Sequence, residues 1–272
     1  MKKILLLGGF GFIGSNIMRY IDMYHLDKYK VVVFDRIAKH HYMPLNKCVE
    51  DVFTGDFCDS NALKTIFKKY KFDFVIHLIN TTVPATSKDI RFDIESNLIS
   101  TIDLLNLMVE YDNKKIVYFS SGGAIYGDLE DGKKHKESDN AMPLSSYGVV
   151  KLAIEKYLYQ FYRNYGICPT ILRLSNTYGP LHYSDKQGVI NVAIRAAINN
   201  KEFSIWGDGT AKKDYIYIED VCYVLMKLLE NQPVNKIINV GSGKAHTLNS
   251  IIENIKNEIS DFEWNYIQSQ TT

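Results

Sequence analysis

A glycine-rich segment near the amino terminus constrains the fold of this chain more than any other feature. Residues 8–14 read GGFGFIG, directly after an apolar run at residues 4–7 and directly before residues 15–24, whose pattern predicts a helix. A glycine-rich turn that joins a buried strand to a helix can bind a dinucleotide pyrophosphate, because the helix N-terminus presents free amide groups. The position of these glycines therefore predicts a dinucleotide-binding turn.

Three of the four glycines of this turn have expected roles. Gly8 permits the tight turn, Gly11 lets the backbone approach the phosphates, and Gly14 lets helix and strand pack closely. Phe12 and Ile13 lie between Gly11 and Gly14. The expected cofactor contacts of the turn are Gly8, Gly11, Phe12, Ile13 and Gly14.

An acidic residue follows at the distance that such a turn requires. Asp35 ends the apolar run at residues 31–35 and lies 21 residues after Gly14. A carboxylate there can accept hydrogen bonds from both hydroxyls of the adenosine ribose, and it would repel the 2′-phosphate of NADP. Arg36 weakens this preference because a guanidinium can accommodate that phosphate. We therefore expect NAD as the cofactor and keep NADP as the alternative.

Composition narrows the class of protein further. The chain has 272 residues, 46% of them hydrophobic, which suffices for one large α/β domain with a smaller appendage. Its 32 basic and 31 acidic residues leave a net charge of +1, so no long-range field would attract nucleic acid or an anionic membrane. No apolar run approaches the roughly 18 residues of a membrane span. Four cysteines without ligand spacing or pairing predict no metal site and a reduced, cytoplasmic protein: Cys48, Cys58, Cys168 and Cys222.

Strand-like and helix-like segments alternate through the first two thirds of the chain. The expected strands are residues 4–7, 31–35, 49–54, 74–78, 115–121 and 170–174. The expected helices are residues 15–24, 61–70, 90–111 and 146–165. Such alternation predicts a Rossmann-type, doubly wound parallel sheet with helices on both faces, and we assign residues 1–179 to this α/β cofactor-binding domain.

The alternation becomes less regular after about residue 179. Helices are expected at residues 189–199, 220–230 and 247–259, and short strands at residues 203–206, 215–218 and 237–240. We expect these segments to form a smaller carboxyl-terminal α/β lobe, residues 180–272, which binds substrate and exchanges some segments with the first domain.

A tyrosine and a lysine on one predicted helix carry the chemistry. Tyr147 and Lys151 are four residues apart, so their side chains share one helix face. A phenol with a pKa near ~10 is a poor base at neutral pH, and a neighbouring ammonium would lower that pKa. Ser121 ends the strand at residues 115–121, at the edge where parallel sheets bind ligands, and can orient a substrate hydroxyl beside Tyr147.

Taken together, these residues resemble the extended short-chain dehydrogenase/reductase superfamily, and within it the NAD-dependent nucleotide-sugar epimerase/dehydratase family. The resemblance runs from Ile4 to about Ile259. The motifs that carry it are GGFGFIG, Asp35, Gly55-Asp56, His77-Leu78, Asn97, Ser120-Ser121, Tyr147-x-x-x-Lys151, NTYGP at 176–180, WGDG at 206–209, DYIYIED at 214–220 and NVG at 239–241.

The resemblance implies further site residues. Asp56 and Phe57 would flank the adenine, Leu78 would line the cofactor trough, and Asn97 would help to hold the active-site framework. Lys151 would also bond the nicotinamide ribose. The implied substrate contacts, besides Ser121, are Asn176, Val189, Asn191, Trp206 and Lys213. For Trp206, a place in the core of the small lobe is an equal alternative.

Three departures from the family pattern stand out. The family usually has Ser or Thr where this chain has Gly122, so either Ser121 substitutes or catalysis depends more on the tyrosine. It usually has Arg where this chain has Lys213, which offers a phosphate a point charge instead of a bidentate fork. Relatives usually continue for several dozen residues beyond the position of Thr272, so the chain is expected to be truncated or naturally short.

The expected function is NAD-dependent C4 epimerisation of a nucleotide-activated hexose, a UDP-sugar above all, through a transient 4-keto intermediate. The alternatives are a 4-ketoreductase of a nucleotide deoxysugar and a non-catalytic NAD-binding module. A dehydratase is less favoured, because Gly123-Ala124 stand where that branch has an Asp-Glu pair.

Family relatives often dimerise through two long helices, so we expect a homodimer. Ile154, Leu158 and Phe161 can serve that interface or the core. Polysaccharide synthesis is the pathway that the family suggests.

Overall fold

The chain folds into two compact units. The computed structural model describes residues 1–38, 45–82, 89–127, 133–184, 187–231 and 235–268. The first unit comprises Met1–Leu174 and Val221–Val240, and the second comprises Ser175–Asp220 and the residues from Gly241 onward. The main chain therefore passes between the units three times.

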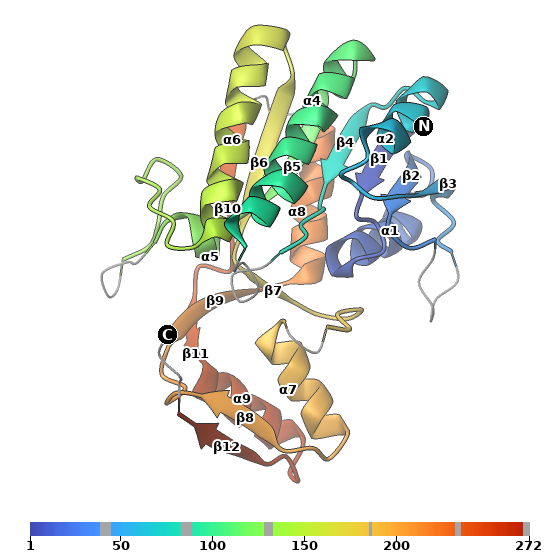
Figure 1. Ribbon diagram of the computed structural model, residues 1–272. Helices are drawn as coiled ribbons and strands as arrows, with labels where there is room; N and C mark the ends of the chain where they lie inside the picture. Colours follow the sequence, from blue (N-terminus) through green and yellow to red (C-terminus); the bar gives the residue numbers. More distant parts are fainter. Residues whose placement is uncertain (39–44, 83–88, 128–132, 185–186, 232–234, 269–272) are drawn as a thin grey trace. The chain divides into compact units, whose positions relative to one another are not determined.

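A parallel sheet of seven strands forms the centre of the first unit (Figure 1). Its strands are β1 (Lys2–Leu7), β2 (Tyr29–Asp35), β3 (Val49–Thr54), β4 (Phe74–His77), β5 (Lys115–Ser121), β6 (Cys168–Leu174) and β10 (Lys236–Val240). They follow the order β10-β6-β5-β4-β1-β2-β3 and pair in parallel throughout. The strand order reverses between β1 and β4, and ligands bind outside the carboxyl ends of strands at such a point. The predicted Rossmann-type architecture is confirmed.

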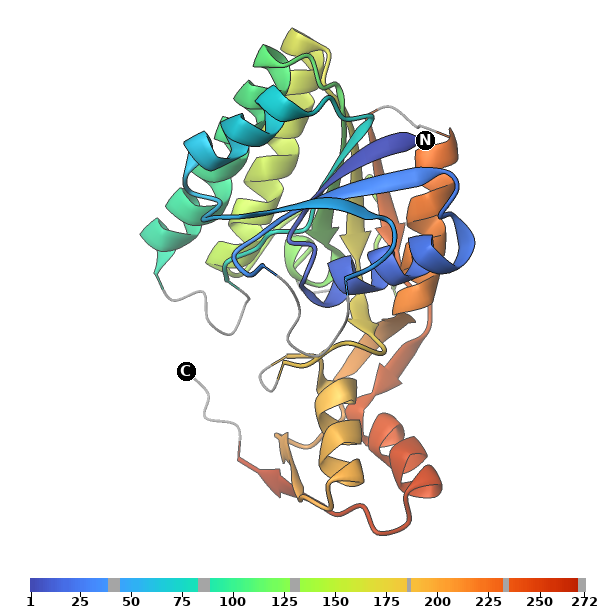
Figure 2. The same ribbon diagram turned by 90° about the vertical axis from the view of Figure 1, so that its right-hand side faces the viewer.

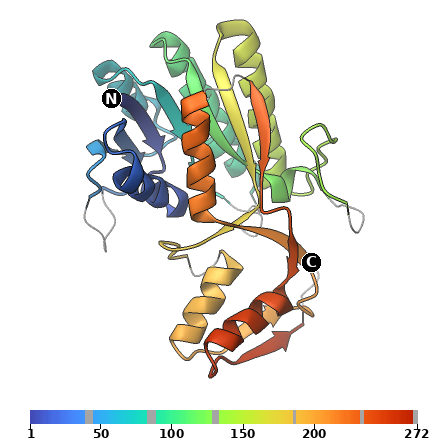
Figure 3. The ribbon, with the colours of Figure 1, turned by 180° about the vertical axis from the view of Figure 1, so that it is seen from behind.

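Helices cover both faces of this sheet (Figures 2 and 3). The helices of the first unit are α1 (Phe12–Tyr24), α2 (Ser60–Lys69), α3 (Ile90–Asp93), the π-helix η1 (Ile94–Ile99), α4 (Ser100–Glu110), α5 (Gly122–Ile125), α6 (Ser146–Tyr165) and α8 (Ile218–Asn231), whose first turn belongs to the second unit. Figure 2 shows α2, α4 and α6 on one face and α1 with α8 on the other.

Alternate residues of the central strands build the core under the helices. Leu5 and Leu7 of β1 are fully buried in one apolar cluster with residues of α2, α4 and α6. Burying one such side chain stabilises the fold by about 1.5–3 kcal/mol. Ile154, Leu158 and Phe161 belong to the same cluster and are 5% exposed at most, so they serve the core and not a subunit interface.

The single helix expected over residues 90–111 is interrupted by the π-helix η1. Hydroxyl groups inside this segment bond to main-chain carbonyls: Ser100 Oγ donates to Glu95 O at 3.1 Å, and Ser96 Oγ donates to Phe92 O at 2.6 Å. Side chains of this kind compete with the regular backbone pattern and bend helices. π-Helical turns occur often at functional sites.

The second unit is smaller and mixed. It contains β7 (Asn176–Tyr178), α7 (Val189–Ile198), β8 (Phe203–Trp206), β9 (Lys212–Tyr217), β11 (Ala245–Thr247), α9 (Leu248–Glu258) and β12 (Trp264–Ile267). The strands form one sheet in the order β11-β9-β7 and a parallel pair of β12 with β8. Ala193, Phe203, Ile252 and Phe262 lie in a separate apolar core between these elements.

The boundary between the units differs from the expected division at residue 179. The second unit begins at Ser175, and residues 221–240 return to the first unit. The cause is strand pairing: β10, which we expected in the small lobe, pairs with β6 so that Asn239 lies opposite Arg173.

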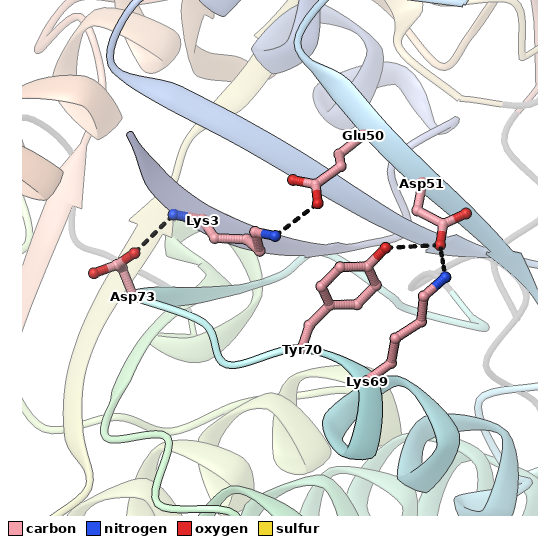
Figure 4. A network of polar contacts seen from close by, with 6 residues as sticks. All are labelled: Lys3, Glu50, Asp51, Lys69, Tyr70 and Asp73. Atoms are coloured by element: carbon pink, nitrogen blue, oxygen red, sulfur yellow. Dashed lines mark hydrogen bonds and ion pairs between the residues drawn. The ribbon is translucent and has the colours of Figure 1, made fainter.

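A network of polar contacts joins the first residues of β1 to β3 and α2 (Figure 4). Its members are Lys3, Glu50, Asp51, Lys69, Tyr70 and Asp73, and we call it the Lys3 network. Lys3 Nζ lies 2.7 Å from Glu50 Oε1, while Asp51 Oδ2 accepts from Lys69 Nζ at 2.7 Å and from Tyr70 Oη at 3.0 Å. The β2–β3 register shifts beside Glu50, and this irregularity lets two consecutive carboxylates reach one cluster.

Candidate active site

The glycine-rich turn between β1 and α1 has the geometry of an anion-binding loop. Gly8 adopts φ of +81°, which side chains rarely tolerate, and Gly11 is the N-cap of α1. A Cβ atom at Gly14 would lie 2.5 Å from Gly9 O, so only glycine allows this packing. No acidic residue occupies the first turn of α1, which leaves the positive end of the helix dipole open to an anion.

Asp35 reaches this turn from the end of β2. Its Oδ2 accepts the Phe10 N–H at 2.9 Å, which fixes the carboxylate beside the loop. Arg36 is exposed, and its charge is one of the causes that lower the pKa of Asp56. The first cause there is the backbone hydrogen bond that Cys58 N–H donates to Asp56 Oδ1 at 2.9 Å. The lowered pKa keeps the Asp56 carboxylate ionised at neutral pH.

The end of β4 lies next to the same turn. Leu78 N–H donates to Leu7 O at 3.1 Å, so Leu78 lies beside the end of β1. Phe57 is 4% exposed, and its ring lies 5.1 Å from the ring of His77 in the core. The Phe57 ring is therefore packed in the core.

Asn97, in the π-helix η1, holds the segment that follows β4. The side chain is buried, its Oδ1 accepts Thr81 N–H at 2.9 Å, and its Nδ2 donates to Thr81 Oγ1 at 2.7 Å. Both ends of the amide are thus engaged with Thr81. This arrangement fits the expected framework role of Asn97.

Ser121, Tyr147 and Lys151 come together at the carboxyl end of β5. The Ser121 and Tyr147 side chains hydrogen-bond to each other. Lys151 lies one turn along α6 and is 4% exposed; its Nζ donates to Phe119 O at 2.9 Å and lies 5.8 Å from the centroid of the Tyr147 ring. The structure therefore brings the three expected catalytic residues into one cluster.

Burial governs the ionisation of this cluster. It raises the pKa of Tyr147, and the hydrogen bond with Ser121 offsets part of the rise. Burial also lowers the pKa of Lys151 to about 7, against the opposing effect of the Glu155 carboxylate. The net direction for the pKa of Tyr147 is therefore opposite to the expected one, because burial dominates.

Close packing between β5, β6 and α6 sets these positions. A Cβ atom at Gly148 would collide with Ala124 O, so the glycine after Tyr147 lets α6 approach α5. At Gly122 a Cβ atom would lie 3.2 Å from Leu174 O, a tight contact. The departure at Gly122 thus has a packing reason, and the hydroxyl that reaches Tyr147 comes from Ser121.

The other expected substrate residues belong to the second unit. Asn191 Nδ2 donates to Gly179 O at 2.6 Å and Asn176 Nδ2 donates to Asp214 O at 2.9 Å, so both amides support local backbone. Val189 opens α7 and packs on the core of this unit. Trp206 is 67% exposed, which excludes the core alternative for its side chain. Lys213 is exposed on β9, opposite His246 of β11.

Sequence reasoning missed a buried ion pair next to the cluster. Glu155 and Arg173 are 3% and 4% exposed, and Arg173 Nη2 lies 2.6 Å from Glu155 Oε2. The signal was available: Glu155 follows Lys151 by four residues on α6, just as Lys151 follows Tyr147.

The described residues contain no group of three or more His, Cys, Asp or Glu side chains that could hold a metal ion. No helix in the same part of the chain is long and apolar enough to cross a membrane.

Comparison with known proteins gives consistent matches. A profile described as the NAD dependent epimerase/dehydratase family matches residues 4–241. A curated putative UDP-glucose 4-epimerase of Methanocaldococcus jannaschii is 34% identical over 259 residues, which cover 94% of this chain and 82% of that protein.

Solved structures agree over almost the whole chain. The crystal structure of UDP-glucose 4-epimerase with UDP-glucose from Thermotoga maritima has a TM-score of 0.90 at 30% identity, covering 99% of this chain and 86% of that one. The crystal structure of Thermus thermophilus UDP-glucose 4-epimerase in complex with NAD has a TM-score of 0.89 at 27% identity, covering 98% and 87%.

Proposed function

Since the chain belongs to the NAD dependent epimerase/dehydratase family, we propose that it epimerises a nucleotide-activated sugar at C4, with a UDP-hexose as the substrate class. The family consists of enzymes that use NAD. The observation that carries the proposal is the cluster of Ser121, Tyr147 and Lys151 at the ligand-binding edge of the sheet.

The protein groups of this cluster divide the proton chemistry. Oxidation at C4 releases the hydroxyl proton, which the Tyr147 phenolate would accept, and the resulting phenol would return it to the sugar oxygen when the 4-keto group is reduced. Ser121 shares the hydrogen bond and orients the sugar hydroxyl toward the phenol. Lys151 is half protonated at about pH 7, and its ammonium form stabilises the phenolate.

The turn after β1 fits NAD. Backbone fills the space at Gly14, the first turn of α1 carries no acidic residue and suits a diphosphate, and Asp35 would accept hydrogen bonds from the adenosine ribose. Arg36 and Asp56 flank that position. Bound NAD supplies reversible oxidation at the sugar C4, through a transient 4-keto sugar.

The second unit would supply the remaining sugar-nucleotide contacts. Trp206 presents an exposed ring that can stack on a base, and Lys213 presents an exposed charge suited to a phosphate. Asn176, Asn191 and Val189 would act through the backbone that they support.

We also infer a homodimer in the cytoplasm that serves polysaccharide synthesis. Apolar side chains are exposed on adjacent helices: Ile90 and Phe92 lie on α3, Ile99 lies on η1, which leads into α4, and Val149 and Tyr157 lie on α6. Figures 1 and 2 both show α4 beside α6. Exposed apolar patches of this kind favour association between copies. Light scattering of the wild type and of Phe92→Glu tests this; a monomeric wild type would overturn it.

The activity is tested by incubating the purified protein with UDP-glucose and with UDP-N-acetylglucosamine and measuring the 4-epimers. We expect conversion to an equilibrium mixture without net consumption of reduced cofactor. Stoichiometric oxidation of NADH by a 4-keto deoxysugar nucleotide would identify a ketoreductase instead. Absence of turnover on every nucleotide hexose would favour a binding module.

A further inference from the structure

A buried ion pair connects the elements that carry the candidate catalytic residues. Glu155 lies on α6 and Arg173 on β6; Arg173 Nε donates to Glu155 Oε1 at 3.0 Å and Nη2 donates to Oε2 at 2.6 Å. Ser120 of β5 donates to the same Oε1 at 2.6 Å. One carboxylate thereby receives three hydrogen bonds and joins a helix to two strands.

We propose that Glu155, clamped by Arg173, is a positioning residue for the reaction: it fixes the end of β5 against α6 and supplies the negative charge that faces Lys151. The claim about catalysis rests on the proposed function. The claim about Lys151 rests on the geometry of the first unit alone.

The contacts of Glu155 place it between the two halves of the cluster. Ser120, which donates to Glu155, directly precedes Ser121, which bonds to Tyr147. On α6, residues Tyr147, Lys151 and Glu155 follow each other at intervals of four and share one face. A shift of Glu155 therefore moves Ser121 and Lys151 together.

Among the described residues, Glu155 is the group that supplies negative charge near Lys151, because the other groups around Lys151 are uncharged. Tyr118 and Tyr147 present neutral rings, with Nζ 4.7 Å and 5.8 Å from their centroids. His77 of β4 is buried, and its lowered pKa keeps it uncharged. Glu155 raises the pKa of Lys151 against burial, which lowers it.

Arg173 holds the Glu155 carboxylate in place. Its third donor, Nη1, bonds to Tyr126 Oη at 2.8 Å, and that hydroxyl donates to Asn239 Oδ1 at 2.6 Å. Asn239 in turn donates its N–H to Glu137 Oε1 at 2.8 Å. With these bonds the guanidinium is fixed, so it can hold Glu155 in a single bidentate geometry.

The test measures the ionisation of Lys151 directly. Protein labelled with ¹³C-lysine is titrated by NMR, and the Lys151 signal is assigned by its loss in Lys151→Met. Glu155→Gln is compared with the double variant Glu155→Gln/Arg173→Gln, which leaves no lone buried guanidinium. Glu110→Gln removes a carboxylate from an exposed pair with Lys64 and is the matched control.

We expect the Lys151 midpoint to fall by about one pH unit in both Glu155 variants, because an opposite charge nearby is lost. At about pH 7 the ammonium fraction, and with it kcat on the sugar nucleotide, should fall about fivefold, whereas KM stays within about twofold. Glu110→Gln should change neither quantity.

Each other outcome counts against the proposal. An unchanged Lys151 midpoint in a folded Glu155 variant overturns it. Loss of the fold in both Glu155 variants assigns the pair to folding alone and overturns it too. Ser120→Ala leaves the ion pair intact and should lower kcat severalfold. An unchanged kcat would show that Glu155 does not act through its hydrogen bond with Ser120 of β5. If the wild type converts no nucleotide hexose, the proposed function fails, and the NMR midpoints still decide the role of Glu155.

Discussion

Two polar networks in the first unit use similar residues in different surroundings. The Lys3 network joins lysines, carboxylates and a tyrosine at the surface, where the side chains of Lys3 and Glu50 are 28% and 34% exposed (Figure 4). The network around Glu155 and Arg173 joins the same kinds of groups with exposures of 2% and 4%. Both contain short, well-aligned contacts.

The comparison teaches that short distances do not measure importance. Water screens the exposed pairs, so each contributes between zero and about 1 kcal/mol. The buried pair lost its hydration on folding, a cost that the attraction between the two charges offsets, and removing one partner leaves the other charge buried without compensation. We therefore expect the Lys3 network to tolerate substitution, and the buried network to control stability and chemistry.

The two networks should differ most in how kcat responds when a tyrosine is replaced, Tyr147 beside the buried network and Tyr70 in the Lys3 network. Tyr147→Phe removes the proposed proton donor and should lower kcat by about 10²–10⁴-fold with little change in stability. Tyr70→Phe removes a hydroxyl that donates to Asp51 and should leave kcat unchanged. Steady-state kinetics with thermal melts checks both; a Tyr147→Phe enzyme of normal activity would contradict the assignment.

The two ion pairs should differ strongly in stability. Arg173→Met leaves the Glu155 carboxylate buried without its partner and should cost about 3–5 kcal/mol of unfolding free energy. Adding Glu155→Leu should restore most of that loss. Lys64→Met, at an exposed pair with Glu110, should cost far less, because water screens that pair. Urea denaturation distinguishes them, and equal losses at both pairs would refute the comparison.

The contributions of Lys151 and Lys69 to the free energy of unfolding should depend on pH in different ways. Burial lowers the pKa of Lys151 to about 7, so between about pH 7 and 10 the unfolded chain binds a proton that the folded protein lacks. Stability contributed by this site therefore rises with pH in that range. The hydrogen bond to Asp51 raises the pKa of Lys69, whose contribution is lost only above its unfolded value of 10.5.

Denaturation at several pH values tests this pair of expectations. The difference in unfolding free energy between the wild type and Lys151→Met should increase in favour of the wild type from about pH 7 to 9. The same difference for Lys69→Met should stay flat. Parallel curves for the two lysines would show that Lys151 is not desolvated.

The smallest effect should come from Asp51. Its pKa is lowered first of all by the hydrogen bond from Lys69, so the stabilisation is present at neutral pH and is lost as the pH falls below about 4. Asp51→Asn should cost less than about 1 kcal/mol, and molar salt should reduce the loss further. A loss as large as that of Arg173→Met would mean that the Lys3 network is not solvent-screened.

Local signals predicted most of the fold. Helix α6 begins after Ser145, whose side chain accepts Gly148 N–H, and ends at Gly166 with φ of +71°, so its bounds could be read directly. The partner of β10 could not, because an apolar strand pattern does not state which edge it joins. The π-helix η1 was missed for a similar reason: backbone competition from Ser96 and Ser100 leaves the apolar spacing almost unchanged.

Part of the candidate site could also be predicted from the sequence. The four-residue interval predicted that Tyr147 and Lys151 share a face, and Asp35 was found by its distance from the glycines. The direction of the Tyr147 pKa was predicted wrongly, because burial is a property of the folded protein. Glu155 was missed since a carboxylate on an amphipathic helix is usually solvated, and Arg173 since it stands inside an apolar strand.

The return of β10 to the central sheet has a practical consequence for dissecting this protein. A fragment ending at Leu174 would strip β6 of its neighbour and leave a hydrophobic edge with free amides and carbonyls. Such a piece would tend to aggregate by edge-to-edge pairing. The cofactor-binding half must therefore be produced with its downstream return, for instance by bridging Leu174 to Val221 with a short flexible spacer.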